Sequence, residues 1–473
     1  MTSEIKIGIT SAKGYDVIVC GGGPAGCAAA IAARRMGLSV LVVESTSQLG
    51  GMTVSGLVSH WLGGRTQEGE WVVGGIFKEL AQETAEAGYS LIPQLNPNEA
   101  YHPYGWFNWF IHGIPYDPFS MALYLDGKMK KEGVDVLLCT SFISSTVEEN
   151  RISHVILHNA TGLLEIPCGA VIDSTGNAEV AHNCGCPTLK GRPEDGKAAP
   201  SSLIFHVYGV DTKALTKAIE ENKDPKFRDL IAELRSKGIW NFPYDIFVCT
   251  KLTEDGVYFI NTIRLCGVDG TDGWSVSDGL RRGREEVNAL MHILRSYFPG
   301  FSNARLKTVA PALGVRESRH IVGEYVLTEE DLIHGRDFKD CIGFSMYGWD
   351  LPDPDKPSIQ PFADDLKSGF TPKVNKRPFT PLPYRMMVPV GVSNLICPGR
   401  AVSAQGQALG PIRVTAPCMA MGQAAGTAAG AVIREGKRFS DVDLNWLRSA
   451  LIDAGAIVDV ARLPVIHPRI DQT

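Results

Sequence analysis

The sequence predicts an α/β protein in which a parallel sheet, with helices on both sides, is interleaved with an α+β region. An apolar run from Tyr15 to Cys20 is followed by a glycine-rich turn, an alanine-rich segment and a second apolar run, Leu38 to Val43. Two further apolar runs, near 169–173 and 394–397, also lead into glycine-containing turns. Continuous apolar runs are typical of buried parallel strands, whereas the alternating segments between them favour antiparallel strands.

The composition is that of an ordinary globular protein. Hydrophobic residues make up 44% of the 473-residue chain and charged residues 21%, which excludes disorder, collagen and a disulfide-rich miniprotein. The net charge is −6 without a long run of one sign, so we expect no nucleic-acid partner. No apolar stretch approaches the roughly 18 residues of a membrane span, and residues 1–14 lack a signal-peptide pattern. We therefore expect no membrane span and a cytoplasmic protein.

The first predicted strand runs directly into a glycine-rich turn with the sequence Gly21-Gly22-Gly23-Pro24-Ala25-Gly26. In a GxGxxG fingerprint the first glycine permits a tight turn and the second lets the backbone approach a pyrophosphate. The third lets the helix pack closely on the strand. The helix that follows presents its N-terminal N–H groups and its dipole to the phosphates.

The second predicted strand ends at Glu44, about twenty residues after the fingerprint, where a dinucleotide-binding fold carries an acid for the ribose diol. A glycine-rich turn without function would leave the two strands, the helix and the acidic residue to be explained separately. The sequence therefore predicts a Rossmann-like dinucleotide-binding unit.

The segment after Glu44 indicates which dinucleotide binds. Ser45 follows directly, and Gly50, Gly51 and Met52 come soon after. A second Gly-Gly pair at this place resembles the FAD enzymes of the glutathione-reductase-like superfamily, in which the segment lies along the pyrophosphate and the flavin. The resemblance implies FAD as the cofactor and these four residues among its ligands.

The resemblance covers the chain from about residue 14 to 435. A strand over 134–138 leads to Ser141, at the place where the superfamily contacts adenine, and the strand from Gly169 ends in Ser-Thr-Gly176. Near the C-terminus come the pairs and turns Gly399-Arg400 and Gly410-Pro-Ile-Arg413-Val414, followed by a helix from about Thr415 to Arg434.

These segments are similar to the broad FAD-dependent oxidoreductase family of bacteria, distantly related to the fumarate reductase flavoproteins. The resemblance implies that they also bind FAD, with N–H groups of Gly410 to Val414 directed at the flavin pyrimidine.

The cofactor and substrate regions are expected to alternate along the chain. Residues 14–60, 130–200 and 390–435 form the predicted FAD-binding domain, whereas 61–129 and 201–389 form a predicted substrate or cap domain. In the latter, 201–208 and 256–263 alternate as antiparallel strands do, and 211–237 and 276–298 have helical patterns. Residues 436–473 are expected to form a short helix and a tail.

Candidate catalytic residues lie outside the cofactor motifs. His60 follows the Gly51 segment and could face the flavin, Tyr384 could supply a proton, and Arg316 could hold an anion. For each, a structural role is the alternative interpretation. The ring-rich segment from Tyr101 to Tyr116 suits a pocket wall or a lid, and equally an ordinary core or subunit contact.

The eleven cysteines are scattered without a CxxC pair, so we predict neither a metal site nor a catalytic disulfide at Cys184 and Cys186. One fingerprint implies one resident dinucleotide. We expect a dehydrogenase or oxidase that transfers a hydride from a small organic substrate to flavin N5, with oxygen, a quinone or a protein as the electron acceptor. An NAD(P)H-using monooxygenase and a non-catalytic flavoprotein or electron-transfer subunit remain alternatives, and a homo-oligomer remains open.

Overall fold

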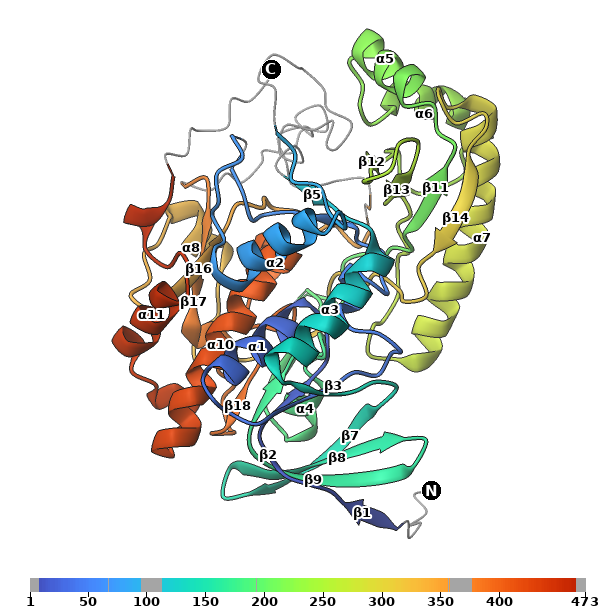
Figure 1. Cartoon of the computed structure of the whole chain (residues 1–473). Helices are drawn as coiled ribbons and strands as arrows, with labels where there is room; N and C mark the ends of the chain where they lie inside the picture. The colour runs from blue at the N-terminus through green and yellow to red at the C-terminus, as the bar shows by residue number, and fades with distance from the viewer. Residues whose placement is uncertain are drawn as a thin grey trace.

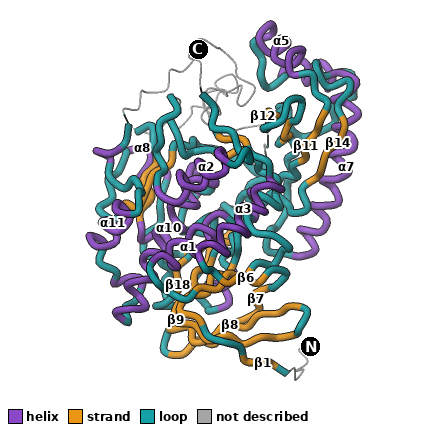
Figure 2. Tube along the Cα trace, viewed as in Figure 1, coloured by secondary structure: helices purple, strands orange, loops and turns teal. Residues whose placement is uncertain are grey.

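The computed structural model describes residues 8–66, 68–94, 113–192, 194–355, 357 and 377–464. Its helices and strands form two main regions, each with a sheet and helices packed beside it (Figure 1). The trace coloured by secondary structure separates the long helices from the loops that join them (Figure 2). The α/β class predicted from the sequence is confirmed.

A parallel sheet occupies the first region, with strands in the order β6, β3, β2, β9 and β18. Their bounds are Asp135–Leu137 (β6), Val40–Val43 (β3), Tyr15–Cys20 (β2), Gly162–Asp173 (β9) and Leu395–Ile396 (β18). The strands predicted from apolar runs are all present. Since parallel strands share one direction, their carboxyl ends meet at one edge, where a cofactor-binding crevice forms.

Strand β9 belongs to two sheets at once. Residues 168–173 pair with β2, whereas residues 162–167 pair with an antiparallel neighbour, β8, and residues 163–165 pair with β1. The additional strands are β1 (Ile9–Ser11), β7 (Ser141–Glu148) and β8 (Arg151–Asn159). The antiparallel strands β7 and β8 are therefore joined to the parallel sheet through β9.

The central strands bury both of their faces. Val17 and Val19 of β2 join a core with the helices α1, α2, α3 and α10, whereas Ile18 and Cys20 join a core with β8 and α4. The helices are α1 (Pro24–Arg35), α2 (Gly75–Glu86), α3 (Pro118–Glu132), α4 (Glu179–Asn183) and α10 (Thr415–Glu435). Burial on both faces explains the continuous apolar runs of residues 17–20 in β2 and 40–43 in β3.

Helices α1 and α10 cross with almost no space between their backbones. A Cβ atom added at Gly422 would lie 2.1 Å from the carbonyl oxygen of Ala25, and one added at Gly426 would lie 2.1 Å from that of Ala29. The four-residue spacing of these glycines places them on one face of α10. The helix predicted from about Thr415 to Arg434 is confirmed, and Gly422 and Gly426 allow its close packing on α1.

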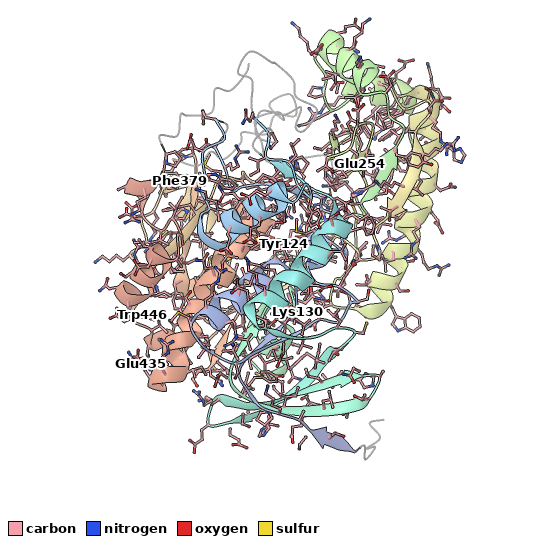
Figure 3. All side chains as sticks on the ribbon, in the orientation of Figure 1. Tyr124, Lys130, Glu254, Phe379, Glu435 and Trp446 are labelled. Carbon is pink, nitrogen blue, oxygen red and sulfur yellow. The ribbon has the colours of Figure 1, made fainter. Side chains whose placement is uncertain are left out.

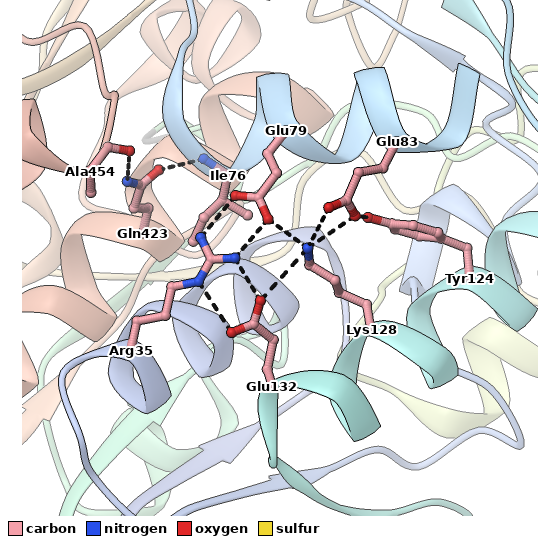
Figure 4. Close-up of polar contacts among 9 residues, drawn as sticks. All are labelled: Arg35, Ile76, Glu79, Glu83, Tyr124, Lys128, Glu132, Gln423 and Ala454. Carbon is pink, nitrogen blue, oxygen red and sulfur yellow. Dashed lines mark hydrogen bonds and ion pairs between the residues drawn. The ribbon is translucent and has the colours of Figure 1, made fainter. Parts of the chain in front are cut away.

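An ion network joins the outer surfaces of α1, α2 and α3 (Figure 4). Lys128 has only 3% of its side chain exposed and lies 2.5 Å from Glu79 and 3.0 Å from Glu83. Arg35 lies 2.6 Å from both Glu79 and Glu132. Hydrogen bonds from Arg35, and after it Lys128, lower the pKa of Glu79 to about 2 against the opposing effect of burial. The network ties three helices together on one side of the cofactor sheet.

The second region is an antiparallel sheet in the order β12, β13, β11 and β14. The strands are Cys249–Lys251 (β12), Tyr258–Ile260 (β13), Phe205–Tyr208 (β11) and Arg305–Val309 (β14). Helices α5 (Thr212–Asn222), α6 (Arg228–Ser236) and α7 (Gly273–Tyr297) pack beside it. The strands predicted at 201–208 and 256–263 are therefore present, and the helical pattern of 211–237 divides into two helices.

Short elements complete the described part of the chain. They are β4 (His60–Trp61), β5 (Ile114–Pro115), β10 (Thr188–Lys190), β15 (Arg319–Ile321), α8 (Glu329–His334), β16 (Cys341–Ser345), β17 (Thr380–Pro383), α9 (Leu409–Ile412) and α11 (Leu444–Asp453). Trp446 on α11 and Glu254 beside the second sheet mark opposite sides of the molecule (Figure 3). In the ranges described, no helix is long and apolar enough to cross a membrane.

Candidate cofactor and substrate site

The glycine-rich turn has the geometry of a phosphate-binding loop. Gly21 has a φ of +101°, and a Cβ atom there would lie 2.4 Å from the carbonyl oxygen of Ser174. A Cβ at Gly26 would lie 1.9 Å from the carbonyl of Gly21. At Gly23, by contrast, a Cβ would meet no atom within 4 Å, because this residue borders a cavity. The turn is thus closed on the protein side and open where a phosphate would approach.

Glu44 is held by backbone groups at the edge of the same cavity. Its Oε2 accepts a hydrogen bond from the Gly22 N–H at 2.8 Å, and its Oε1 accepts one from the Thr46 N–H at 2.8 Å. Oε1 also accepts a hydrogen bond from the Ser45 hydroxyl at 3.3 Å, whereas Oε2 keeps a further acceptor position. Glu44 and Ser45 both border the cavity, so this carboxylate lies where a bound ligand could donate to it.

The second Gly-Gly pair folds back onto the first. The Gly50 N–H donates to the Gly22 carbonyl at 2.7 Å, and a Cβ at Gly51 would lie 2.9 Å from the Cα of Gly23. Gly51 and Met52 border the cavity, whereas Gly50 lies behind its wall. The two glycine motifs, thirty residues apart, therefore form one surface.

The cavity has a volume of about 520 Å³ and extends from the fingerprint to the second sheet, a size typical of ligand sites. Ser141, Gly176, Gly399, Arg400, Arg413 and Val414 border it, as do Pro24 and Ala25. The hydroxyl of Ser174 is buried in this wall without a hydrogen-bond partner in the described structure. An open glycine-rich turn at a helix N-terminus, a carboxylate at the cavity edge and an unused hydroxyl fit FAD.

Three arginines border the part of the cavity that faces the second sheet: Arg264, Arg316 and Arg413. Arg264 is 3% exposed, and its Nη1 donates to the carbonyl of Asn261 at 3.0 Å. Arg316 is 7% exposed and donates to the carbonyl of Pro200 at 2.5 Å. Buried guanidinium groups are costly without counter-charges, so this wall is suited to an anion.

Asp350 is the acidic residue next to these arginines. Its carbonyl accepts a hydrogen bond from Arg413 at 2.6 Å, and its Oδ2 accepts one from the Tyr347 hydroxyl at 2.6 Å. Although burial opposes it, Arg413 and the Tyr347 hydroxyl keep the pKa of Asp350 below its usual value. Asp350 itself borders the cavity.

His60 borders the cavity as predicted, but it is poorly suited to accept a proton. It is 2% exposed, and a Cβ atom on Gly113 would lie 2.1 Å from its Nε2. Burial lowers the pKa of His60 to about 3, so the imidazole is neutral near pH 7. A neutral imidazole can still donate or accept a hydrogen bond.

Tyr384 does not reach the cavity, which corrects its predicted role as a proton donor. It is 1% exposed, and its hydroxyl donates to the carbonyl of Phe439 at 3.0 Å. Gly410 is also absent from the cavity wall, because it packs against the backbone of Asp350, 2.8 Å from the position of an added Cβ. Of the segment from Gly410 to Val414, Arg413 and Val414 border the cavity.

Arg400 borders the cavity, but its donors are used by the protein. They reach the carbonyl of Gly176 at 2.9 Å, Oδ1 of Asn177 at 2.8 Å and the carbonyl of Val315. The side chain thus ties three segments of the wall together. Gly26 likewise acts behind the wall, through the close packing described above.

The ring-rich segment falls largely outside the described residues, which exclude Tyr101 to His112. Tyr116 is described, is fully buried, and donates its hydroxyl to the Thr53 carbonyl at 2.9 Å. Cys184 and Cys186 are free thiols and do not border the cavity. In the described ranges, no cluster of three or more histidine, cysteine or acidic side chains could hold a metal.

The parallel sheet, the fingerprint and the cavity at the carboxyl edge of the strands define a dinucleotide-binding flavoprotein fold. The family model described as FAD dependent oxidoreductase matches residues 16–451. The chain belongs to the FAD-dependent oxidoreductase family; it is an enzyme of that class, and its cofactor is FAD.

Curated relatives match parts of the chain. Digeranylgeranylglycerophospholipid reductase 2 of Methanothermobacter thermautotrophicus is 27% identical over 207 residues, which is 42% of this chain and 48% of the relative. A thioredoxin reductase of Ureaplasma parvum is 29% identical over 87 residues, 18% of this chain and 28% of the relative. The chain therefore spans about half the length, or less, of these relatives.

Solved structures resemble the chain over most of its length at low identity. A geranylgeranyl bacteriochlorophyll reductase-like protein of Thermoplasma acidophilum has 14% identity and a TM-score of 0.46, covering 95% of this chain and 85% of its own. A flavin-dependent brominase has 14% identity and a TM-score of 0.47, covering 93% of this chain and 83% of its own.

Proposed function

We propose that this FAD-dependent oxidoreductase removes a hydride from a small organic substrate and passes it to N5 of the flavin. The observation that carries the proposal is one cavity with two unlike ends. The fingerprint and Glu44 border one end, and buried arginines with Asp350 and Tyr347 border the other. A substrate held at the second end would lie beside the reacting part of a cofactor held at the first.

The substrate end offers a group for an anion and a hydrogen-bond acceptor for the reacting group. Arg316 would hold a carboxylate or oxyanion of the substrate, in the role predicted from the sequence. The hydroxyl of Tyr347, which donates to Oδ2 of Asp350 at 2.6 Å, would accept a hydrogen bond from the O–H or N–H group of the substrate, and the proton lost with the hydride would pass to water. His60 would contribute a neutral hydrogen-bonding group rather than a base.

The electrons would leave through an external acceptor: oxygen, a quinone or a protein. FAD supplies two-electron chemistry, and the protein supplies position and charge. The predicted FAD ligands and the alternation of FAD-binding and substrate segments along the chain form part of this proposal. The reductase named among the relatives acts on a digeranylgeranylglycerophospholipid, which would require reaction in the opposite direction at a less polar wall.

The proposal is tested by anaerobic mixing of purified enzyme with alcohols, amines and hydroxy or enoic acids. We expect at least one substrate to bleach the flavin absorbance without NAD(P)H. Arg316→Gln should slow this bleaching at least tenfold, about 1.4 kcal/mol of barrier. Arg305→Gln, a change on the exposed edge of β14, is the matched control and should leave the rate unchanged.

Two results would overturn the proposal. Bleaching by NAD(P)H alone, accelerated by an aromatic ligand, would establish a monooxygenase. A flavin that no organic donor and no nicotinamide reduces would establish a non-catalytic or electron-transfer flavoprotein.

A further inference from the structure

Two of the cavity arginines are brought together by backbone pairing. Residues 200–202 run between two segments: Ser201 forms a bridge with Leu265, and Ser202 forms one with Gly314. Arg264 precedes the first contact, and Arg316 follows the second and donates to Pro200. Both guanidinium groups therefore enter the cavity from adjacent extended segments.

The third arginine comes from a segment that is distant in the sequence. Arg413 lies just before α10, and its Nη2 lies 3.5 Å from Oδ2 of Asp350. Among the described residues, Arg413 is the one of the three that forms an ion pair with a carboxylate. Arg264 and Arg316 have no carboxylate of this part of the chain within ion-pair distance, so they are a surplus of two buried positive charges beside the cavity.

Two of the three guanidinium groups have unused hydrogen-bond donors. Nε of Arg264 and Nε of Arg413 are buried without a hydrogen-bond partner in the described structure. Burial first, and then Arg264 and Arg413, lower the pKa of Arg316 well below its usual value. Like charges are thus held close together out of water, an arrangement that a bound anion stabilises.

The phosphates of FAD do not account for this surplus. Their proposed place is the start of α1, bordered by Gly23 and Ala25, where backbone N–H groups supply the positive charge. Arg400 also borders the cavity, but it donates to the carbonyl of Gly176 and to Oδ1 of Asn177. The surplus at Arg264 and Arg316 is therefore available to the substrate.

Resting on the function proposed above, we propose that the substrate is a small organic dianion of the dicarboxylate kind, with its two carboxylates divided between Arg264 and Arg316. Guanidinium groups pair with carboxylates through two parallel N–H donors, which fixes orientation as well as charge. A dianion would neutralise the wall, whereas a monoanion would leave one guanidinium buried and unpaired.

The competing explanation is that one of the two surplus positive charges stabilises the reduced flavin. The two explanations differ in the oxidised enzyme, where only a substrate can bring negative charge to these arginines. We therefore choose a binding measurement that requires no turnover. The probes are unbranched dicarboxylates of three to six carbons, each with its own monoamide, which has the same size and one charge fewer.

Each probe is titrated into oxidised holoenzyme, and the change in the flavin absorption spectrum reports the dissociation constant. We expect the best dicarboxylate to bind at least tenfold more tightly than its monoamide. In Arg264→Gln this ratio should fall to about one, whereas in Arg305→Gln it should stay as in the unmodified enzyme. Arg264→Lys keeps the charge but loses the paired donors, so it should retain part of the ratio. This variant provides the test if Arg264→Gln fails to bind FAD.

A ratio near one for every chain length in the unmodified enzyme would overturn the dianion proposal. So would sulfate binding as tightly as any dicarboxylate, because the wall would then hold an adventitious ion only. A dicarboxylate that binds tightly but never bleaches the flavin would contradict the hydride-transfer proposal and leave the dianion site intact. Bleaching of the flavin by a neutral alcohol, in an enzyme that does not prefer dicarboxylates to their monoamides, would contradict the dianion proposal and leave the hydride-transfer proposal intact.

Discussion

Replacing Gly422 with alanine should push α1 away from α10 and weaken FAD binding. The added Cβ would lie 2.1 Å from the carbonyl oxygen of Ala25, whereas ordinary contact begins at 3.4 Å. One helix must therefore move by about 1.3 Å, because a backbone carbonyl cannot rotate aside. Ala25 also borders the cavity, so the displacement reaches the turn where we place the pyrophosphate.

The expected cost follows from two opposing effects. Forcing a methyl group into a packed core costs about 1–3 kcal/mol, and replacing a helical glycine with alanine returns roughly 0.5–1 kcal/mol. A net loss of about 1–2 kcal/mol in the free energy of FAD binding corresponds to an approximately 5- to 30-fold higher dissociation constant. The measurement is FAD titration of the stripped protein followed by flavin fluorescence, with thermal unfolding of the holoenzyme in parallel.

Gly430→Ala is the matched control, on the same helix and with the same gain in helix propensity. Its Cβ would lie 2.9 Å from Cε of Met36, the movable end of a flexible side chain. We expect unchanged FAD affinity and equal or slightly higher stability. If Gly422→Ala behaves like this control, the crossing of α1 and α10 does not set the position of the phosphate turn, and the reasoning is refuted.

Three further predictions concern the fingerprint, the cysteines and the ion network. Gly23→Val should fold but lose its yellow colour, since its side chain would enter the open space of the cavity; a variant that retains FAD would contradict this. Cys184→Ser with Cys186→Ser should leave flavin reduction within about threefold, and a loss beyond tenfold, about 1.4 kcal/mol, would indicate a redox role. Lys128→Met should lower the melting temperature most near pH 7. The difference should shrink as the pH falls from about 4.5 toward 2, because Glu79 is protonated only there in the folded enzyme; a constant difference would exclude the linkage.

The cofactor half could be predicted because its determinants are local. Gly21, Gly23 and Glu44 lie within one strand–helix–strand unit, and each backbone requirement is visible in the residue type. The helix predicted from about Thr415 to Arg434 likewise directly follows the turn at Gly410 to Val414. A structural requirement that falls within about thirty residues can be predicted from the spacing of the residue types alone.

The substrate half could be predicted only in part, because its residues meet through distant pairing. Arg264 and Arg316 become neighbours through the bridges of residues 200–202, which leave no periodic signal in the sequence. Tyr347 and Asp350 lie in a segment without a recognisable motif. Tyr384 was misplaced because nearness to a cofactor strand along the chain does not determine where a side chain ends; its hydroxyl reaches Phe439 instead.

The contact between α1 and α10 also has a consequence for biosynthesis. Arg35 leaves the ribosome 380 residues before Thr415 does, an interval on the order of half a minute at roughly 5–20 residues per second. During that time the nascent chain exposes the alanine-rich face of α1, and β18 has not yet joined β9. The first unit to emerge is therefore among the last to finish folding. Moving the C-terminal segment ahead of β2 by circular permutation would shorten this exposed period. Such a variant would change the yield of folded enzyme separately from the activity of the enzyme once folded.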